Sequence, residues 1–190
     1  MLIPLLKLMG IYIIRVINNM KEIIYNYDLL KETDINKIVE RAKAVIVNSK
    51  NELLLGYGSK NYQLIGGHVE DGETSLECLH REILEEAGID IDTNDLKPFI
   101  RITYYNKDYP NNSDNSKYIA NYYIVNTDVK PNLSKVNLTE NEKEGMFQFK
   151  YIPSDKVLRE LEKSLTTCTR TGVVLDTIEV IKEYLKISRK

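Results

Sequence analysis

Residues 66–89 read "GGHVEDGETSLECLHREILEEAGI". This stretch carries seven carboxylates, of which Glu82, Glu85 and Glu86 stand almost side by side. The whole chain of 190 residues has a formal net charge of −2, so its overall composition does not account for such a local concentration of acid. The stretch therefore needs an explanation of its own.

Local signals predict a helix inside this stretch. Thr74 and Glu77 have the spacing of a capping box, which places the start of the helix near Ser75. Gly88 suits the left-handed conformation that commonly ends a helix. The apolar residues of the predicted buried face recur at helical spacing: Leu76, Leu79, Ile83 and Ala87.

The three clustered glutamates are unfavourable for folding alone. Glu82, Glu85 and Glu86 are spaced i, i+3 and i+4, so their side chains converge on one patch of the helix. The patch lies toward the helix C-terminus, where the macrodipole disfavours negative charge by roughly 0.3–1 kcal/mol per group. A hard divalent cation, which prefers carboxylate oxygens, would reverse this balance. The alternative interpretation is a solvated charged face without a ligand.

The wider motif resembles the Nudix box, Gx5Ex7REUxEExGU, where U is a bulky aliphatic residue. Every position is filled here: Gly67, Glu73, Arg81, Glu82, Ile83, Glu85, Glu86, Gly88 and Ile89. Seven fixed identities at roughly 7% usage each would coincide by chance in about one window in 10⁸. The family usually has a proline before its paired glycines, whereas Ile65 stands there in this chain.

The resemblance implies an α/β/α sandwich with a mixed β-sheet and a loop–helix–loop catalytic motif. It also implies hydrolysis of a nucleoside diphosphate linked to another moiety, with water attacking phosphorus and Mg²⁺ or Mn²⁺ as cofactor. Glu85 and Glu86 would be metal ligands, Glu82 a ligand or the base that activates water, and Gly66 a ligand through its backbone carbonyl.

Further site residues follow from the same resemblance. Arg81 and Glu73 would pair, and Arg81 would orient a catalytic glutamate. The family often adds one acid from a loop before a late strand, for which the candidates are Glu140, Glu142 and Glu144, with Glu144 or Glu142 favoured.

Substrate contacts are harder to assign from the sequence. His68, beside Gly67, and Tyr104 are the candidates outside the acidic loop, although most tyrosines are expected to pack in the sheet. The identity of the substrate depends on loops such as 106–117, which the sequence alone does not decode.

The rest of the chain predicts one mixed α/β domain over 20–190. Short apolar or alternating runs predict strands at 41–48, 52–57, 97–105, 117–126 and 145–152. Helical spacing predicts two further helices at 154–165 and 173–185.

The first nineteen residues form a Leu- and Ile-rich stretch that Lys7 and Arg15 interrupt. The uninterrupted apolar part is shorter than the roughly 18 residues of a membrane-spanning helix, and a secretory cleavage site is lacking. We expect a dispensable N-terminal extension, with an interfacial helix as the alternative.

The charge and cysteine content of the chain narrow the classes of binding partner that are expected. A pI of about 5.8 gives no general attraction to nucleic acid. Cys78 and Cys168 lack a ligand spacing, so free thiols in a cytoplasmic protein are expected. The expected partner is a small nucleotide, and a homodimer is left open.

Two other functions are compatible with the fold that the resemblance implies. One is a nucleotide-sensing module without turnover, against which the complete set of carboxylates argues. The other is an isoprenoid diphosphate isomerase, which would need additional acids or cysteines around its site.

Overall fold

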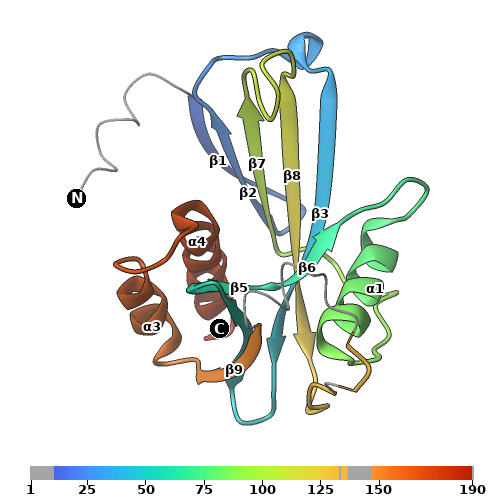
Figure 1. Cartoon of the computed structure of the whole chain (residues 1–190), viewed down its shortest axis with the longest axis vertical. Helices are drawn as coiled ribbons and strands as arrows, with labels where there is room; N and C mark the ends of the chain where they lie inside the picture. The colour runs from blue at the N-terminus through green and yellow to red at the C-terminus, as the bar shows by residue number, and fades with distance from the viewer. Residues whose placement is uncertain (1–10, 133, 137–146, 190) are drawn as a thin grey trace.

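A single mixed β-sheet forms the centre of the protein. The computed structural model describes residues 11–132, 134–136 and 147–189. The strands are β1 (Ile11–Ile17), β2 (Met20–Asn26), β3 (Lys37–Val47), β4 (Glu52–Gly58), β5 (Asn61–Gln63), β6 (Ile65–His68), β7 (Ile100–Asn106), β8 (Ser116–Asn126) and β9 (Gln148–Pro153). The helices are α1 (Ser75–Ala87), α3 (Val157–Ser164) and α4 (Thr171–Ile187), with a 3-10 turn at Glu32–Asp34. Helix α1 covers one face of the sheet and α3 and α4 cover the other, which confirms the predicted α/β/α sandwich (Figure 1).

Strand β3 organises the sheet, whose order is β1-β2-β7-β8-β3-β4-β5. One edge of β3 pairs in parallel with β8 along its whole length. The other edge divides, pairing with β4 at Ile46 and Val47 and with β6 at residues 41–44. Because β6 leads directly into the loop before α1, the pairing of β3 with β6 fixes where the acidic motif begins.

The two faces of β3 belong to different cores. Ala42 and Ala44 are completely buried against α1, where Leu79 is also completely buried, and such small side chains let the helix approach closely. Val45 points to the opposite face and packs in the core that contains Ile181 of α4. This alternation anchors α1 and α4 on opposite sides of one strand.

The caps predicted for α1 are confirmed. Thr74 Oγ1 accepts a hydrogen bond from the backbone N–H of Glu77 at 3.3 Å, and Glu77 Oε2 accepts one from the N–H of Thr74 at 2.7 Å. Gly88 has a φ of 64° and its N–H donates to Leu84 O at 2.9 Å. These contacts fix both ends of the helix that carries the glutamates.

The other predicted elements are present with boundaries shifted by a few residues. The prediction missed β5 and β6, which are short, and β2. Ser59 and Lys60, in the turn of the β4–β5 hairpin, both have positive φ, as in the two-residue turns that favour hairpins.

The expected N-terminal extension contains a strand of the sheet. Residues 11–17 form β1, antiparallel to β2, so the alternative of an interfacial helix is wrong over these residues. Asn18 (φ 50°) and Asn19 (φ 66°) form the turn between the strands. A pair of asparagines between two apolar runs is a hairpin signal that the sequence offered. No helix within the described residues is long and apolar enough to cross a membrane.

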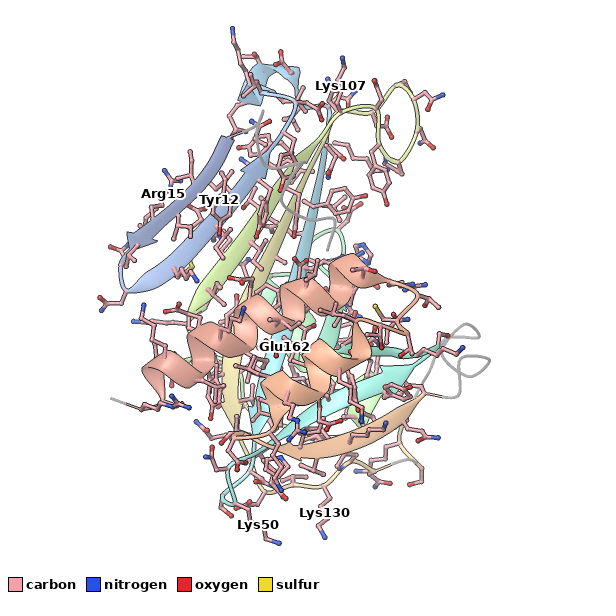
Figure 2. The ribbon with its side chains drawn as sticks, turned by 90° about the vertical axis from the view of Figure 1, so that its left-hand side faces the viewer. Tyr12, Arg15, Lys50, Lys107, Lys130 and Glu162 are labelled. Atoms are coloured by element: carbon pink, nitrogen blue, oxygen red, sulfur yellow. The ribbon has the colours of Figure 1, made fainter. Side chains whose placement is uncertain are left out.

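The sheet extends beyond its helices. In Figure 1 the upper parts of β1, β2, β7, β8 and β3 rise above α4 on one side and α1 on the other. Figure 2 looks onto the face that carries α3 and α4: the helices cross the lower half, and β1 stands at the edge, where Tyr12 and Arg15 are labelled. One end of this sheet face is therefore not covered by a helix.

Candidate active site

The loop before α1 and the outer face of the helix enclose a cavity of about 420 Å³. It brings together six of the residues predicted for the site: Gly66, His68, Arg81, Glu82, Glu85 and Glu86. The rest of the lining comes from β3, β5 and the motif loop: Arg41, Lys43, Gln63, Gly67 and Glu70. The motif therefore surrounds one hollow rather than an open charged surface.

Arg81 connects the loop to the helix. Its Nε and Nη2 donate to the two carboxylate oxygens of Glu73 at 2.8 and 3.0 Å. Its Nη1 donates to Glu82 Oε1 at 2.9 Å and to Glu85 Oε2 at 3.2 Å, and Nη2 also reaches the carbonyl oxygen of His68 at 2.9 Å. These bonds hold the pKa of Glu73 below its ordinary value. Such a fork fixes the direction of both the loop and the two glutamates.

Two of the glutamates are withdrawn from solvent. Glu86 is only 9% exposed, and its Oε2 accepts a hydrogen bond from the N–H of Gly66 at 3.0 Å. Burial raises the pKa of Glu82, with the contact to Arg81 acting in the opposite direction. A nearby cation favours the ionised form of carboxylates that are buried in this way.

Lys43 of β3 supplies one such cation, and the sequence analysis did not identify it. Its Nζ donates to the carbonyl oxygens of Gly66 and Leu64 at 3.2 and 3.3 Å. Burial lowers the pKa of Lys43, while the charge of Glu86 acts to raise it. The signal in the sequence was the alternation "RAKAVIV", in which charged side chains occupy positions of an otherwise buried strand.

Arg41 lies two residues before Lys43 on the same face of β3. Its Nη2 lies 3.0 Å from Nε2 of His68. Burial, followed by the charge of Arg41, lowers the pKa of His68. The Nε atom of Arg41 is buried and has no hydrogen-bond partner within the described residues. Buried donors without a partner are uncommon in native proteins, so this one calls for an explanation.

The donor atoms suit a hard divalent cation. Three carboxylates and the carbonyl of Gly66 offer oxygen only, as Mg²⁺ and Mn²⁺ prefer. As the side chains are placed, the described residues contain no ready cluster of three or more His, Cys, Asp or Glu around one point. Glu82 and Glu85 turn toward Arg81, so a cation would compete with that guanidinium for them.

Other predicted residues lie elsewhere. Tyr104 lines a second cavity, of about 510 Å³, in which its hydroxyl donates to Asp176 of α4. Glu140, Glu142 and Glu144 fall outside the described residues. Cys78 and Cys168 are free thiols, as expected.

The two cavities adjoin each other. Arg41, Lys43 and Gln63 line both of them, so a single molecule could extend from the glutamates to Tyr104. Sequence reasoning missed Asp176 because it stands in the predicted helix 173–185 without any motif around it.

Known proteins resemble this chain in sequence and in fold. The NUDIX domain family model matches residues 38–168, which is more than half of the chain. A MutT protein from Methanosarcina mazei Go1 aligns with a TM-score of 0.51 at 21% identity, covering 79% of this chain and 96% of that one. An Ap4A hydrolase of C. elegans aligns with a TM-score of 0.49 at 17% identity, covering 80% and 98%. The chain belongs to the Nudix family and is an enzyme of the pyrophosphohydrolase type.

Proposed function

We propose that the protein is a divalent-metal-dependent hydrolase that cleaves the phosphoanhydride of a nucleoside diphosphate linked to another moiety. The observation that carries this proposal is the grouping of Glu82, Glu85 and Glu86 around one cavity, where Arg81 bonds to the first two of them and, on its other side, to Glu73. A structural ion-pair network would not need Glu86 buried beside a glycine backbone. A binding site for cation and phosphate accounts for both features.

The motif residues divide into two groups by role. Glu82, Glu85, Glu86 and the carbonyl of Gly66 would hold Mg²⁺ or Mn²⁺. The bound ion supplies charge neutralisation at the phosphate and lowers the pKa of a water molecule. Glu82 completes the set of ligands or takes the proton of the attacking water.

Arg81 and Glu73 act as positioning residues. The two-pronged contact between them leaves Nη1 of Arg81 directed at Glu82 and Glu85. Replacing Arg81 would release the carboxylates of Glu82 and Glu85 from their present orientation. Changes at residues that orient metal ligands typically reduce metal affinity or activity by 10–100-fold.

The positive side chains of β3 complement the glutamates. Lys43 and Arg41 lie on the side of the cavity that leads to Tyr104, where they can balance the charge of a phosphate chain. Phosphoryl transfer depends mainly on positioning and charge stabilisation, so no covalent nucleophile is required.

A panel assay tests the proposal. Nucleoside triphosphates, ADP-ribose, nucleotide sugars and dinucleoside polyphosphates are incubated with the protein, and phosphate release is followed with an added phosphatase or pyrophosphatase. We expect hydrolysis of at least one compound with Mg²⁺ or Mn²⁺, its loss in EDTA and its return when metal is restored. Full activity after exhaustive chelation, or no hydrolysis of any compound, would contradict the proposal. The second result would favour a sensing module.

A further inference from the structure

The strand register places four tyrosines side by side across the sheet. Tyr12 pairs with Tyr25, Tyr25 with Tyr104, and Tyr104 with Tyr118, so β1, β2, β7 and β8 each contribute one ring. Paired residues of neighbouring strands point to the same face. The rings of Tyr25 and Tyr104 stack with centroids 4.8 Å apart and an angle of 13° between their planes. This tyrosine row lies on the sheet face that carries α4, because Tyr25 and Tyr104 pack against the core of that face. Figure 2 labels its outermost member, Tyr12, on the edge strand β1.

A hollow follows the tyrosine row in the direction of the glutamates. The next residues in register are Ile102 and Ala120, and Ala120 in turn pairs with Arg41. Ala120 is small, and the space above it belongs to the cavity of about 510 Å³ that Tyr104, Tyr118 and α4 enclose. Cavities of this size with aromatic walls are typical of small-molecule sites.

Polar groups stand at both ends of this hollow. Asp176 of α4 forms the wall next to Tyr104, whose hydroxyl donates to its Oδ1. No described residue donates a hydrogen bond to the other oxygen, Oδ2. At the opposite end is Arg41, whose Nε has no hydrogen-bond partner among the residues that the structure describes. Burial raises the pKa of Asp176 to about 6, so the carboxylate is ionised at a pH well above that value and then only accepts hydrogen bonds.

We propose that this cavity binds the nucleoside of the substrate, with the exocyclic amino group of the base donating to Asp176 and the phosphate chain passing Arg41 to the glutamates. This assignment rests on the hydrolase function proposed above and names its substrate class. The class comprises nucleotides of bases with an amino group, namely cytosine, adenine and guanine. Tyr104 and Tyr118 supply flat aromatic surfaces for the base and sugar.

The discrimination follows from hydrogen-bond chemistry. An ionised carboxylate accepts from an amino N–H, as acidic side chains do from the amino group of cytosine in DNA. A carbonyl oxygen in the same place, as in uracil, would face Asp176 with two acceptors and no proton between them. Sites that bond to a substrate N–H reject an analogue without it strongly, because a buried polar group is then left unpaired.

Calorimetric titration of the full-length protein with nucleoside monophosphates tests this assignment without depending on turnover. CMP and UMP form one pair of probes, and GMP and IMP form another, because the members of each pair differ at an amino group. We expect the amino-bearing member to bind at least tenfold more tightly. Asp176→Asn should bring the ratio close to one, because an amide can turn its NH₂ toward a carbonyl.

Two further variants separate recognition from folding. Glu179→Gln removes a carboxylate one turn later on α4, outside the cavity, and should keep the wild-type ratios. Ala120→Leu should fill the hollow and weaken all four monophosphates alike, with the melting temperature preserved.

The assignment is overturned by equal binding within both pairs in the wild type, by no binding at all, by unchanged ratios in Asp176→Asn or by undiminished binding in Ala120→Leu. If these failures accompany metal-dependent hydrolysis in the panel assay, the proposed function stands and only the nucleoside site is wrong.

Discussion

The backbone of Gly67 lies directly against the carboxylate of Glu82. A Cβ atom at Gly67 would be 2.1 Å from Oε1 and 2.4 Å from Cδ of that side chain. Gly67 does not have a positive φ, so space rather than backbone conformation requires glycine here. Gly67, the first glycine of the motif, thus leaves the space that the carboxylate of Glu82 occupies.

Gly67→Ala should therefore damage the site more than the fold. The added methyl group displaces the end of a flexible side chain, so we expect the melting temperature to change by only a few degrees. Hydrolysis should fall by roughly 100-fold, because misplaced groups at a reacting centre cost about that much. Steady-state rates and thermal melts measure the two effects. Gly172→Ala, whose Cβ meets open space, is the matched control and should keep full activity.

Glu86→Gln should remove activity and also lower stability without metal. The helix dipole and the neighbouring Glu82 favour neutralising Glu86, but Lys43 faces it and would lose a counter-charge. The amide oxygen can still accept from Gly66, so we expect a loss of roughly 1–3 kcal/mol rather than complete unfolding. Thermal melts with and without Mg²⁺ should show that the variant gains little from the ion.

Glu77→Gln is the control for Glu86→Gln. Glu77 is exposed in the first turn of α1 and bonds only to the N–H of Thr74 among the described residues. It should lose a little stability with its capping contact and keep its turnover and its response to Mg²⁺. Identical behaviour of the two variants would identify the acidic patch as a solvated face.

Asp176→Asn should stabilise the protein in a defined pH range. The folded-state pKa of Asp176 is raised to about 6 from 3.8, mainly by burial, with Glu179 adding to the shift and Tyr104, Lys43 and Arg41 opposing it. The wild type is thus penalised as pH rises from about 4 to 6, and the full penalty remains above that range. The variant should gain roughly 1–3 kcal/mol at pH 7.5 and nothing near pH 3.5. Chemical denaturation at both values measures this, and an equal gain at both would refute the prediction.

Removal of residues 1–19 should leave the chemistry intact. Among the described residues, strand β1 pairs only with β2. Its described side chains are exposed, and none of them lines either cavity. Glu22 would lose Arg15 but keep Arg101, whose Nη1 lies 3.8 Å from it. A chain starting at Met20 should keep kcat/KM within about twofold and melt a few degrees lower, since roughly 1–2 kcal/mol of edge contacts are lost. A tenfold loss of kcat/KM would show that β1 supports the site.

Sequence alone was sufficient for the features that depend on nearby residues. These features all lie within one short segment around α1. They are the capping box of Thr74 and Glu77, the left-handed Gly88 and the spacing of the glutamates on the helix. Their hydrogen bonds and side-chain contacts join positions three or four apart, so the sequence specifies them directly. The helix and its glutamates could be predicted for this reason, whereas the α/β/α class followed from the resemblance of the motif to the Nudix box.

Tertiary structure decided which distant residues meet these glutamates. Lys43 and Arg41 reach the site because β3 pairs with β6, and Asp176 meets Tyr104 because α4 packs across β7. The tyrosine row exists only in the register that joins four strands, two of which pair in parallel from distant parts of the chain. Such register depends on burial of whole faces and not on any local signal, and a shift of one residue would turn every side chain to the other face. Local sequence therefore specified the motif and the helix that carries it, whereas long-range packing formed the cavity beside them.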